Sequence, residues 1–323
     1  MPSAVTLPGD DIAAPSAGLG DFLAAVHGTE WLLVIFLIYA AAAAFLLPAV
    51  PNVGERVTLW NLGTILICGL LIHFDRGKRF LAIGVIRDWL PLAVLLLAYQ
   101  EMGWFATPQH SHTLETNWVA WDRLFLRGGL KAAIEAFGPL LPSVLEIAYS
   151  LVYTLGPFCL AVLYIYRRRD RVDRVLFLLT IGVLLCYAQF PFWPSEPPRV
   201  VFPGQDLPSS DTIFRHFNLW LLGNAGIHTS VFPSAHVAAA FSAAFGMWRT
   251  LPEHKWVGRF LFVMALLIAT ATVYGRYHYF ADALAGLSMA FAALALTMVR
   301  DALRLTAVRG ANVPEAAREM EHA

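Results

Sequence analysis

The sequence predicts an all-α protein, a polytopic bundle of about eight transmembrane helices. Of its 323 residues, 58% are hydrophobic and 14% are charged, and the mean hydropathy is +0.60. The apolar residues are grouped in runs close to the ~20 residues that a helix needs to cross a bilayer. Together these observations favour a multi-pass membrane protein over the pair of soluble domains that the length alone would allow.

The chain divides at the changes between polar and apolar composition. Residues 1–30 include no Lys or Arg, so this segment lacks the basic flank of a cleavable signal peptide. We expect a tail or interfacial segment over 1–30, N-terminal transmembrane helices over 31–106, an outer interfacial cap over 107–142, a transmembrane core over 143–299 and a cytoplasmic tail over 300–323. The predicted spans are 31–50, 57–74, 88–106, 143–166, 175–193, 231–249, 259–275 and 281–299. Pro48 and Pro51 leave open whether 31–50 crosses the membrane completely.

Basic residues predict the orientation. If both termini are cytoplasmic, 16 of the 23 Lys and Arg residues fall on the inner side and 7 on the outer side, as the positive-inside rule requires. The inner segments are then 75–87, 167–174, 249–259 and 300–323, and the outer segments are 51–56, 107–142, 194–230 and 276–280.

The outer segment 107–142 is too long for a tight turn. It mixes aromatic residues such as Trp118 with charged residues such as Asp122, which is typical of an amphipathic interfacial helix or cap. His110 and His112 lie in this segment two residues apart. With this spacing and no carboxylate partner assigned to them, we do not expect them to bind a metal.

Three cysteines, Cys68, Cys159 and Cys186, lie inside apolar runs and show no C-x-x-C spacing. We therefore interpret them as buried packing residues. The formal net charge of zero gives no sign of a nucleic-acid partner, and the sequence leaves the oligomeric state open.

A histidine and a carboxylate lie four residues apart in Tyr-His278-Tyr-Phe-Ala-Asp282. If this segment is helical, both side chains share a face, and Asp282 can hold one ring nitrogen of His278. The other nitrogen would then be free to act as a nucleophile. A lone interfacial histidine more often only fills space, but the carboxylate partner favours a functional role.

A second motif, Ser230-Val-Phe-Pro233-Ser234-Ala-His236, opens the apolar run at 231–249. Pro233 suits a first helical position, and a helix start presents free N–H groups and a positive dipole to an anion. Ser234 is either a phosphate ligand or an ordinary helix cap. His236 is the candidate acid that protonates a leaving oxygen and the base that activates an acceptor.

Two arginines are candidates for phosphate binding. Arg199 ends the rigid loop Pro194-Ser-Glu-Pro-Pro-Arg199 and offers a planar fork to phosphate oxygens. Arg276 is either a second phosphate cation or an interfacial anchor. His228 and Tyr274 are further candidates for lining the pocket. Under the predicted topology, five candidate residues from three different segments lie on the same outer face: Arg199, Ser234, His236, His278 and Asp282.

The motifs Pro-Ser-Ala-His236 and Gly-Arg-Tyr-His278-Tyr-Phe-Ala-Asp282 resemble two signatures of the type 2 phosphatidic acid phosphatase superfamily, P-S-G-H and S-R-x5-H-x3-D. The resemblance covers about 143–299. It implies a six-helix core with extra helices before it, no metal or other cofactor, and a phospho-histidine mechanism. In that mechanism His278 is the nucleophile, Asp282 its partner and His236 the acid and base.

Two cations of the superfamily signatures are replaced, because their positions hold Phe192 and Thr272. The H-Y-F-x-D form, the P-P-R loop and the segments Asp122-Arg-Leu-Phe and Tyr149-Ser-Leu-Val-Tyr153 resemble the aureobasidin-resistance-type inositol phosphorylceramide synthases. That branch moves a phospho-headgroup between lipids. A site with fewer cations suits a singly charged phosphodiester better than a doubly charged monoester.

These features predict a membrane phosphotransferase that takes a phospho-headgroup, for example phosphoinositol, from a phospholipid and passes it to a lipid alcohol. The alternative is a lipid phosphate or polyprenyl pyrophosphate phosphatase with water as acceptor. A non-catalytic lipid transporter is less favoured, because the ionisable residues collect at one face and not at the membrane centre. We expect the site on the periplasmic, extracellular or lumenal side.

Overall fold

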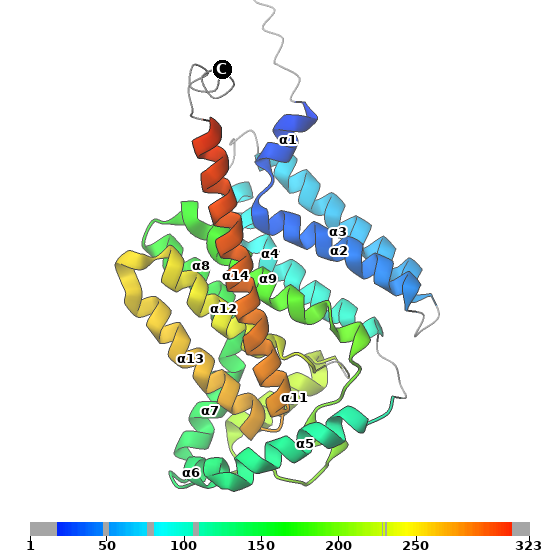
Figure 1. Ribbon diagram of the computed structural model, residues 1–323, viewed down its shortest axis with the longest axis vertical. Helices are drawn as coiled ribbons and strands as arrows, with labels where there is room; N and C mark the ends of the chain where they lie inside the picture. The colour runs from blue at the N-terminus through cyan, green and yellow to red at the C-terminus, as the bar shows by residue number, and fades with distance from the viewer. Residues whose placement is uncertain are drawn as a thin grey trace, which may run out of the picture.

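The protein is described here by a computed structural model covering residues 18–47, 52–75, 81–105, 110–227, 229 and 231–311. All regular structure in these ranges is helical, which confirms the predicted all-α class (Figure 1). The α-helices are α1 (Leu19–Ala25), α2 (Gly28–Leu46), α3 (Val53–Asp75), α4 (Leu81–Met102), α5 (Thr113–Phe125), α6 (Lys131–Glu135), α7 (Leu140–Leu151), α8 (Leu155–Ile165), α9 (Val172–Tyr187), α10 (Pro198–Val201), α11 (Ile213–Ala225), α12 (Ala235–Thr250), α13 (Lys255–Tyr274) and α14 (Phe280–Ala311). The short helical segments are η1 (Gly103–Phe105), η2 (Leu126–Leu130), η3 (Val152–Thr154), η4 (Arg169–Arg171), η5 (Phe190–Phe192) and η6 (Pro252–His254).

Seven helical segments of the described chain are long and apolar enough to cross a membrane. They are Gly28–Leu46, Val53–Asp75, Leu81–Phe105, Leu140–Ile165, Arg169–Phe192, Pro252–Tyr274 and Phe280–Thr306. The remaining predicted span, 231–249, corresponds to α12, which has 16 residues. It is shorter than predicted because the chain before Ala235 is not helical. The helix α12 packs against α9, α13 and α14, so its neighbours cover much of its surface.

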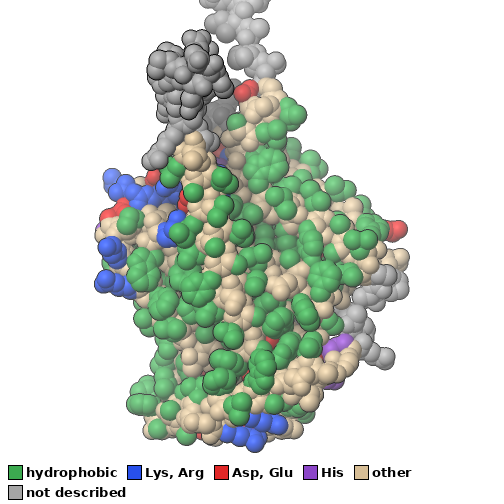
Figure 2. Space-filling view, in the orientation of Figure 1, with side chains coloured by type: hydrophobic (Ala, Val, Ile, Leu, Met, Phe, Trp, Pro, Cys, Tyr) green, Lys and Arg blue, Asp and Glu red, His purple; other side chains and the backbone are tan. Residues whose placement is uncertain are grey.

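The surface agrees with a membrane-embedded bundle. On the face drawn in Figure 2, hydrophobic side chains form a broad belt, whereas Lys and Arg gather toward the two ends of the molecule. A protein that spans a bilayer needs such a belt because lipid tails cannot solvate charge.

Small residues let α12 approach its neighbours closely. Ala238, Ala240 and Ala244 are fully buried, and small side chains of this kind are typical of tightly packed membrane helices. On α9, a Cβ added to Gly182 would lie 2.1 Å from Oγ of Ser242 on α12. The short α12 therefore packs closely against α9.

The segment predicted to form the cap, 107–142, contains α5, η2 and α6, which lie across the lower end of the molecule in Figure 1 and are called the cap below. Trp118 and Asp122 of α5 are buried, whereas Trp121 is 52% exposed. The helix α5 therefore has one side against the bundle, and Trp121 lies on its outward side. The three cysteines, as predicted, are free and buried.

Candidate active site

Two histidines and one carboxylate form a continuous row. Nδ1 of His278 lies 3.3 Å from Oδ2 of Asp282, and Nε2 of His278 lies 3.4 Å from Nδ1 of His236. His278 is 6% exposed and Asp282 is fully buried. The carboxylate can therefore orient one side of the His278 ring while the other side faces His236.

The predicted proximity of His278 and Asp282 is present, but the predicted reason for it is wrong. The helix α14 begins at Phe280, so His278 precedes the helix and the two residues do not share a helical face. Instead, Asp282 turns back toward the start of its own helix, where Oδ2 accepts a hydrogen bond of 2.8 Å from the backbone N–H of Tyr279. A carboxylate in the first helical turn is favoured by the free N–H groups and the dipole there.

The start of α12 lies directly against α14. Ser234 is the N-cap of α12, and its Oγ accepts from the N–H of Val237. Its own N–H donates to the carbonyl oxygen of Asp282 at 3.0 Å. Gly286 permits this approach, because a Cβ there would lie 2.3 Å from the Ser234 carbonyl oxygen. Pro233 lies before the cap and not at the first helical position that the sequence suggested.

Arg199 reaches the same site from a different segment. It lies in the short helix α10, and its backbone N–H donates to the carbonyl oxygen of Arg276 at 3.3 Å. Its guanidinium lies over the ring of Tyr277, 5.5 Å from the ring centre. Burial lowers the pKa of Arg199 below the ordinary value for arginine. This poorly solvated cation is well suited to bind an anion.

Arg199, His236, Tyr277 and His278 border a cavity of about 210 Å³. Its walls are mostly apolar, with many of the side chains from α4, α8, α9 and α12, and Arg199, His236 and His278 lie on the same lining. Among the described residues that line it, Arg199 is the single Lys or Arg. An apolar cavity with one cation and two imidazoles suits a molecule that has a hydrocarbon part and an anionic head.

Tyr149 and Tyr153 are further site residues. The Tyr149 ring stacks on His236 with 5.1 Å between ring centres, and the Tyr153 hydroxyl lies 3.3 Å from Nε2 of His236. Both line the cavity. In the sequence, this segment stands out only for its resemblance to the inositol phosphorylceramide synthases. The signal available in the sequence was the four-residue spacing of the two tyrosines, which would place both rings on one face of a regular helix.

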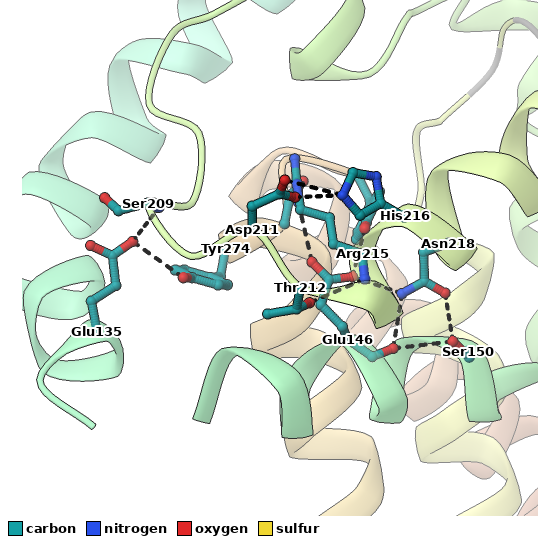
Figure 3. Close-up of polar contacts among 12 residues, drawn as sticks. Glu135, Glu146, Ser150, Ser209, Asp211, Thr212, Arg215, His216, Asn218 and Tyr274 are labelled. Atoms are coloured by element: carbon teal, nitrogen blue, oxygen red, sulfur yellow. Dashed lines mark hydrogen bonds and ion pairs between the residues drawn. The ribbon is translucent and has the colours of Figure 1, made fainter. Parts of the chain in front are cut away.

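A buried polar network centred on Glu146 lies next to the site and contacts Tyr277, the neighbour of His278 in the chain. Glu146 of α7 accepts from Arg215 Nη1 at 3.1 Å, from Asn218 Nδ2 at 2.7 Å and from the Tyr277 hydroxyl at 2.6 Å. Figure 3 shows Glu146 between Arg215 and Asn218, both from α11. Because Tyr277 is adjacent to His278 in the chain, this network fixes the backbone that carries the candidate nucleophile.

The structure does not bring every predicted site residue to the cavity. Arg276 is buried in an ion pair with Asp122 of the cap and is not among the lining residues. Tyr274 donates its hydroxyl to Glu135 at 3.2 Å, also away from the lining. Ser234 caps α12, which is the ordinary role weighed for it, and is also absent from the lining. His228 lies outside the described residues.

The surroundings of His278 favour its neutral form. Burial, and to a smaller extent the positive charge of Arg199, lower the pKa of His278 below the ordinary value for histidine. A backbone hydrogen bond with Val231 acts in the opposite direction. A neutral imidazole keeps the lone pair that a nucleophile needs.

The sequence predicted no carboxylate partner for His110 and His112, and this prediction is wrong. Oε1 of Glu115 lies 2.8 Å from Nε2 of His110 and 3.2 Å from Nδ1 of His112. A carboxylate from the Arg199 loop, Glu196, also lies nearby. None of these four residues lines the cavity.

Comparison with known proteins identifies the family. A PA-phosphatase related-family protein from Dictyostelium discoideum is 45% identical over 56 residues, which are 17% of this chain and 10% of that protein. The match therefore covers about a tenth of the relative's length. No solved structure matches the chain. The family model described as PAP2 superfamily matches residues 124–296. This is more than half of the chain and includes Arg199 and the His–His–Asp row, so the protein belongs to the PAP2 superfamily.

Proposed function

We propose that this protein is an integral-membrane phosphotransferase that moves a phospho-headgroup from a phospholipid diester to a lipid alcohol through a phospho-histidine intermediate. Membership of the PAP2 superfamily indicates lipid phosphatase or phosphotransferase activity. The observation that carries the finer proposal is the cavity, whose mainly apolar lining presents one cation, Arg199, beside His236 and His278.

In the first step, Nε2 of His278 attacks the phosphorus of the donor. The bond between phosphorus and the diacylglycerol oxygen breaks, and His236 gives that oxygen a proton. Asp282 stabilises the positive charge that develops on the His278 ring, and Arg199 stabilises the charge on the phosphoryl oxygens. The products are diacylglycerol and His278 carrying the phospho-headgroup.

In the second step, His236 accepts a proton from the hydroxyl group of the lipid alcohol. The oxygen attacks phosphorus, the bond to His278 breaks, and the new phospholipid leaves. Because these side chains supply the nucleophile and both proton transfers, we expect the chemical step to need no metal. Water in place of the alcohol would give a phosphatase, and this is the alternative function.

Charge favours the diester over the monoester. A phosphate monoester carries nearly two negative charges and a diester one. The two superfamily cation positions hold Phe192, which is 54% exposed, and Thr272, which is buried and donates its hydroxyl to the Ala269 carbonyl. Arg276 does not replace them, because Asp122 neutralises it.

The test uses purified protein in lipid nanodiscs with labelled phosphatidylinositol, phosphatidic acid or polyprenyl pyrophosphate, each with and without a lipid alcohol. We expect a labelled new phospholipid from phosphatidylinositol plus alcohol and little inorganic phosphate from phosphatidic acid. His278→Ala should abolish transfer and the acid-labile phospho-enzyme. His236→Ala should still form some phospho-enzyme from a donor whose leaving group needs no proton.

Rapid phosphate release from phosphatidic acid or polyprenyl pyrophosphate without an acceptor would instead establish the phosphatase. Equal activity of both histidine variants would contradict the assigned roles. Binding of labelled lipids without turnover would favour the transporter.

A further inference from the structure

A cluster of two imidazoles and two carboxylates lies where the start of the cap meets the Arg199 loop. His110 and His112 precede α5, Glu115 is in its first turn, and Glu196 comes from the loop before α10. One ligand atom from each of His110, His112 and Glu196 lies within 4.8 Å of the other two. His112 is 46% and Glu196 30% exposed, so their side chains can adjust.

Glu115 orients both rings. It is fully buried, and Oε1 contacts Nε2 of His110 and Nδ1 of His112 and accepts from the Glu196 N–H at 3.2 Å. This arrangement leaves Nδ1 of His110 and Nε2 of His112 for another partner. Metal-binding histidines commonly donate their second ring nitrogen to a carboxylate in this way, which fixes the tautomer.

The donor set selects the kind of ion. Two imidazole nitrogens and a carboxylate suit Zn²⁺ or a similar transition metal, whereas Mg²⁺ and Ca²⁺ prefer oxygen alone. In a tetrahedral zinc site, bonds of about 2.0–2.2 Å place neighbouring ligand atoms roughly 3.3–3.6 Å apart. Nε2 of His112 and Oε2 of Glu196 are already 3.9 Å apart. A divalent cation would also offset the paired negative charges of Glu115 and Glu196.

We propose that His110, His112 and Glu196 bind one zinc ion, with Glu115 orienting the two imidazoles and water as the fourth ligand. The ion would fasten the Arg199 loop to the cap, because Glu196 lies three residues before Arg199 and the intervening Pro197 lines the cavity. Its role is positional: it takes no part in bond making or breaking, and it makes the placement of Arg199 dependent on zinc.

The experiment measures zinc binding by the full chain in detergent micelles after treatment with a chelator and dialysis. We expect one zinc per chain, by equilibrium dialysis and elemental analysis, and a higher melting temperature with zinc. His112→Ala and Glu196→Gln should weaken binding at least about tenfold and remove the rise in melting temperature. Glu115→Gln should weaken it about 10–100-fold, as for other residues that orient metal ligands.

The matched control is His216→Ala, which removes another exposed imidazole that pairs with a carboxylate, Asp211. It should bind zinc like the unmodified protein. The proposal is wrong if His112→Ala and Glu196→Gln, with unchanged elution and zinc-free melting temperature, bind zinc as tightly as His216→Ala. It is equally wrong if the unmodified protein binds no zinc at micromolar concentration. These readouts need no substrate, so they are independent of the proposed phosphotransfer.

Discussion

At the scale of single residues, the charge of Arg199 acts on the protonation of His278. Burial is the larger cause of the lowered pKa of His278, and Arg199 adds to it. In the proposed mechanism the neutral His278 ring is the reactive form, so activity should be lost as the pH falls through this pKa. Removing the Arg199 charge allows the pKa to rise, and the loss of activity should then begin at a higher pH.

We therefore predict that Arg199→Gln shifts the acid limb of kcat/KM to higher pH and lowers its maximum by about 10²–10³-fold. Arg199→Lys keeps the positive charge, so the acid limb of kcat/KM should stay at the same pH. The lysine cannot make the forked contact of arginine with phosphate, so the maximum of kcat/KM should still fall. The measurement is kcat/KM against pH with a short-chain donor, which reports groups of the free enzyme. An unchanged acid limb in Arg199→Gln would show that Arg199 does not control this protonation.

Residue patterns in the sequence predicted part of the site. The spacing of His278 and Asp282 and the helix start before His236 predicted three residues that the structure brings together in one row. Local patterns could not identify the partner of Arg276, because Asp122 is 154 residues away in the chain. Asp122 reaches Arg276 only when the cap is folded, and the resulting ion pair leaves Arg276 unavailable to bind phosphate.

At the scale of helices, the contact between α12 and α14 determines the separation of His236 and His278. Gly286→Ala would place its Cβ against the Ser234 carbonyl oxygen and so push the two helix starts apart. We predict a loss of phosphotransfer, since displacement by about 1 Å can cost on the order of 10²-fold. The assay is transfer rate together with melting temperature.

Gly69→Ala is the matched control, because Gly69 lies inside α3 and a Cβ there meets nothing within 4 Å. It should keep both activity and melting temperature. If Gly286→Ala transfers as fast as Gly69→Ala, the close contact is not needed for the site.

A second link between elements joins the cap to the start of α14. Asp122 of α5 forms a fully buried ion pair with Arg276, and its Oδ1 accepts from the Phe280 N–H at 2.7 Å. Asp122→Asn keeps the shape but leaves the Arg276 charge uncompensated. We predict destabilisation by about 3–5 kcal/mol, the usual cost of breaking a buried pair from one side, measured by denaturant unfolding in micelles.

The control for this pair is Asp206→Asn, whose partners Arg123 and Arg127 are both more exposed than Arg276. This substitution should lower the free energy of unfolding by about 1 kcal/mol or less. Replacing both members, as in Asp122→Asn with Arg276→Met, should recover part of the loss, since no unpaired charge stays buried. A double variant less stable than Asp122→Asn would contradict this account.

At the scale of the whole molecule, the sequence predicted the bundle because bilayer thickness fixes the length of an apolar run. It did not predict the short α12, whose start is set by the nonhelical segment before Ala235 and by the contact of Ser234 with α14. The spacing of Tyr149 and Tyr153 did not reveal that both rings lie against His236, because this contact forms only when α7 and η3 lie beside the start of α12.

The last prediction concerns sidedness. The excess of Lys and Arg in the segments predicted to be inner favours a site on the outer side of the membrane. Ser209 is exposed in the 194–230 segment, and Asp170 is 73% exposed at the opposite, basic end of the predicted topology. The native cysteines are buried, so they should give little background. In intact cells, an impermeant thiol reagent should label Ser209→Cys and leave Asp170→Cys unlabelled until the membrane is opened. The reverse pattern would place the His236 and His278 chemistry on the cytoplasmic side, where its donor and acceptor lipids would have to come from the inner leaflet.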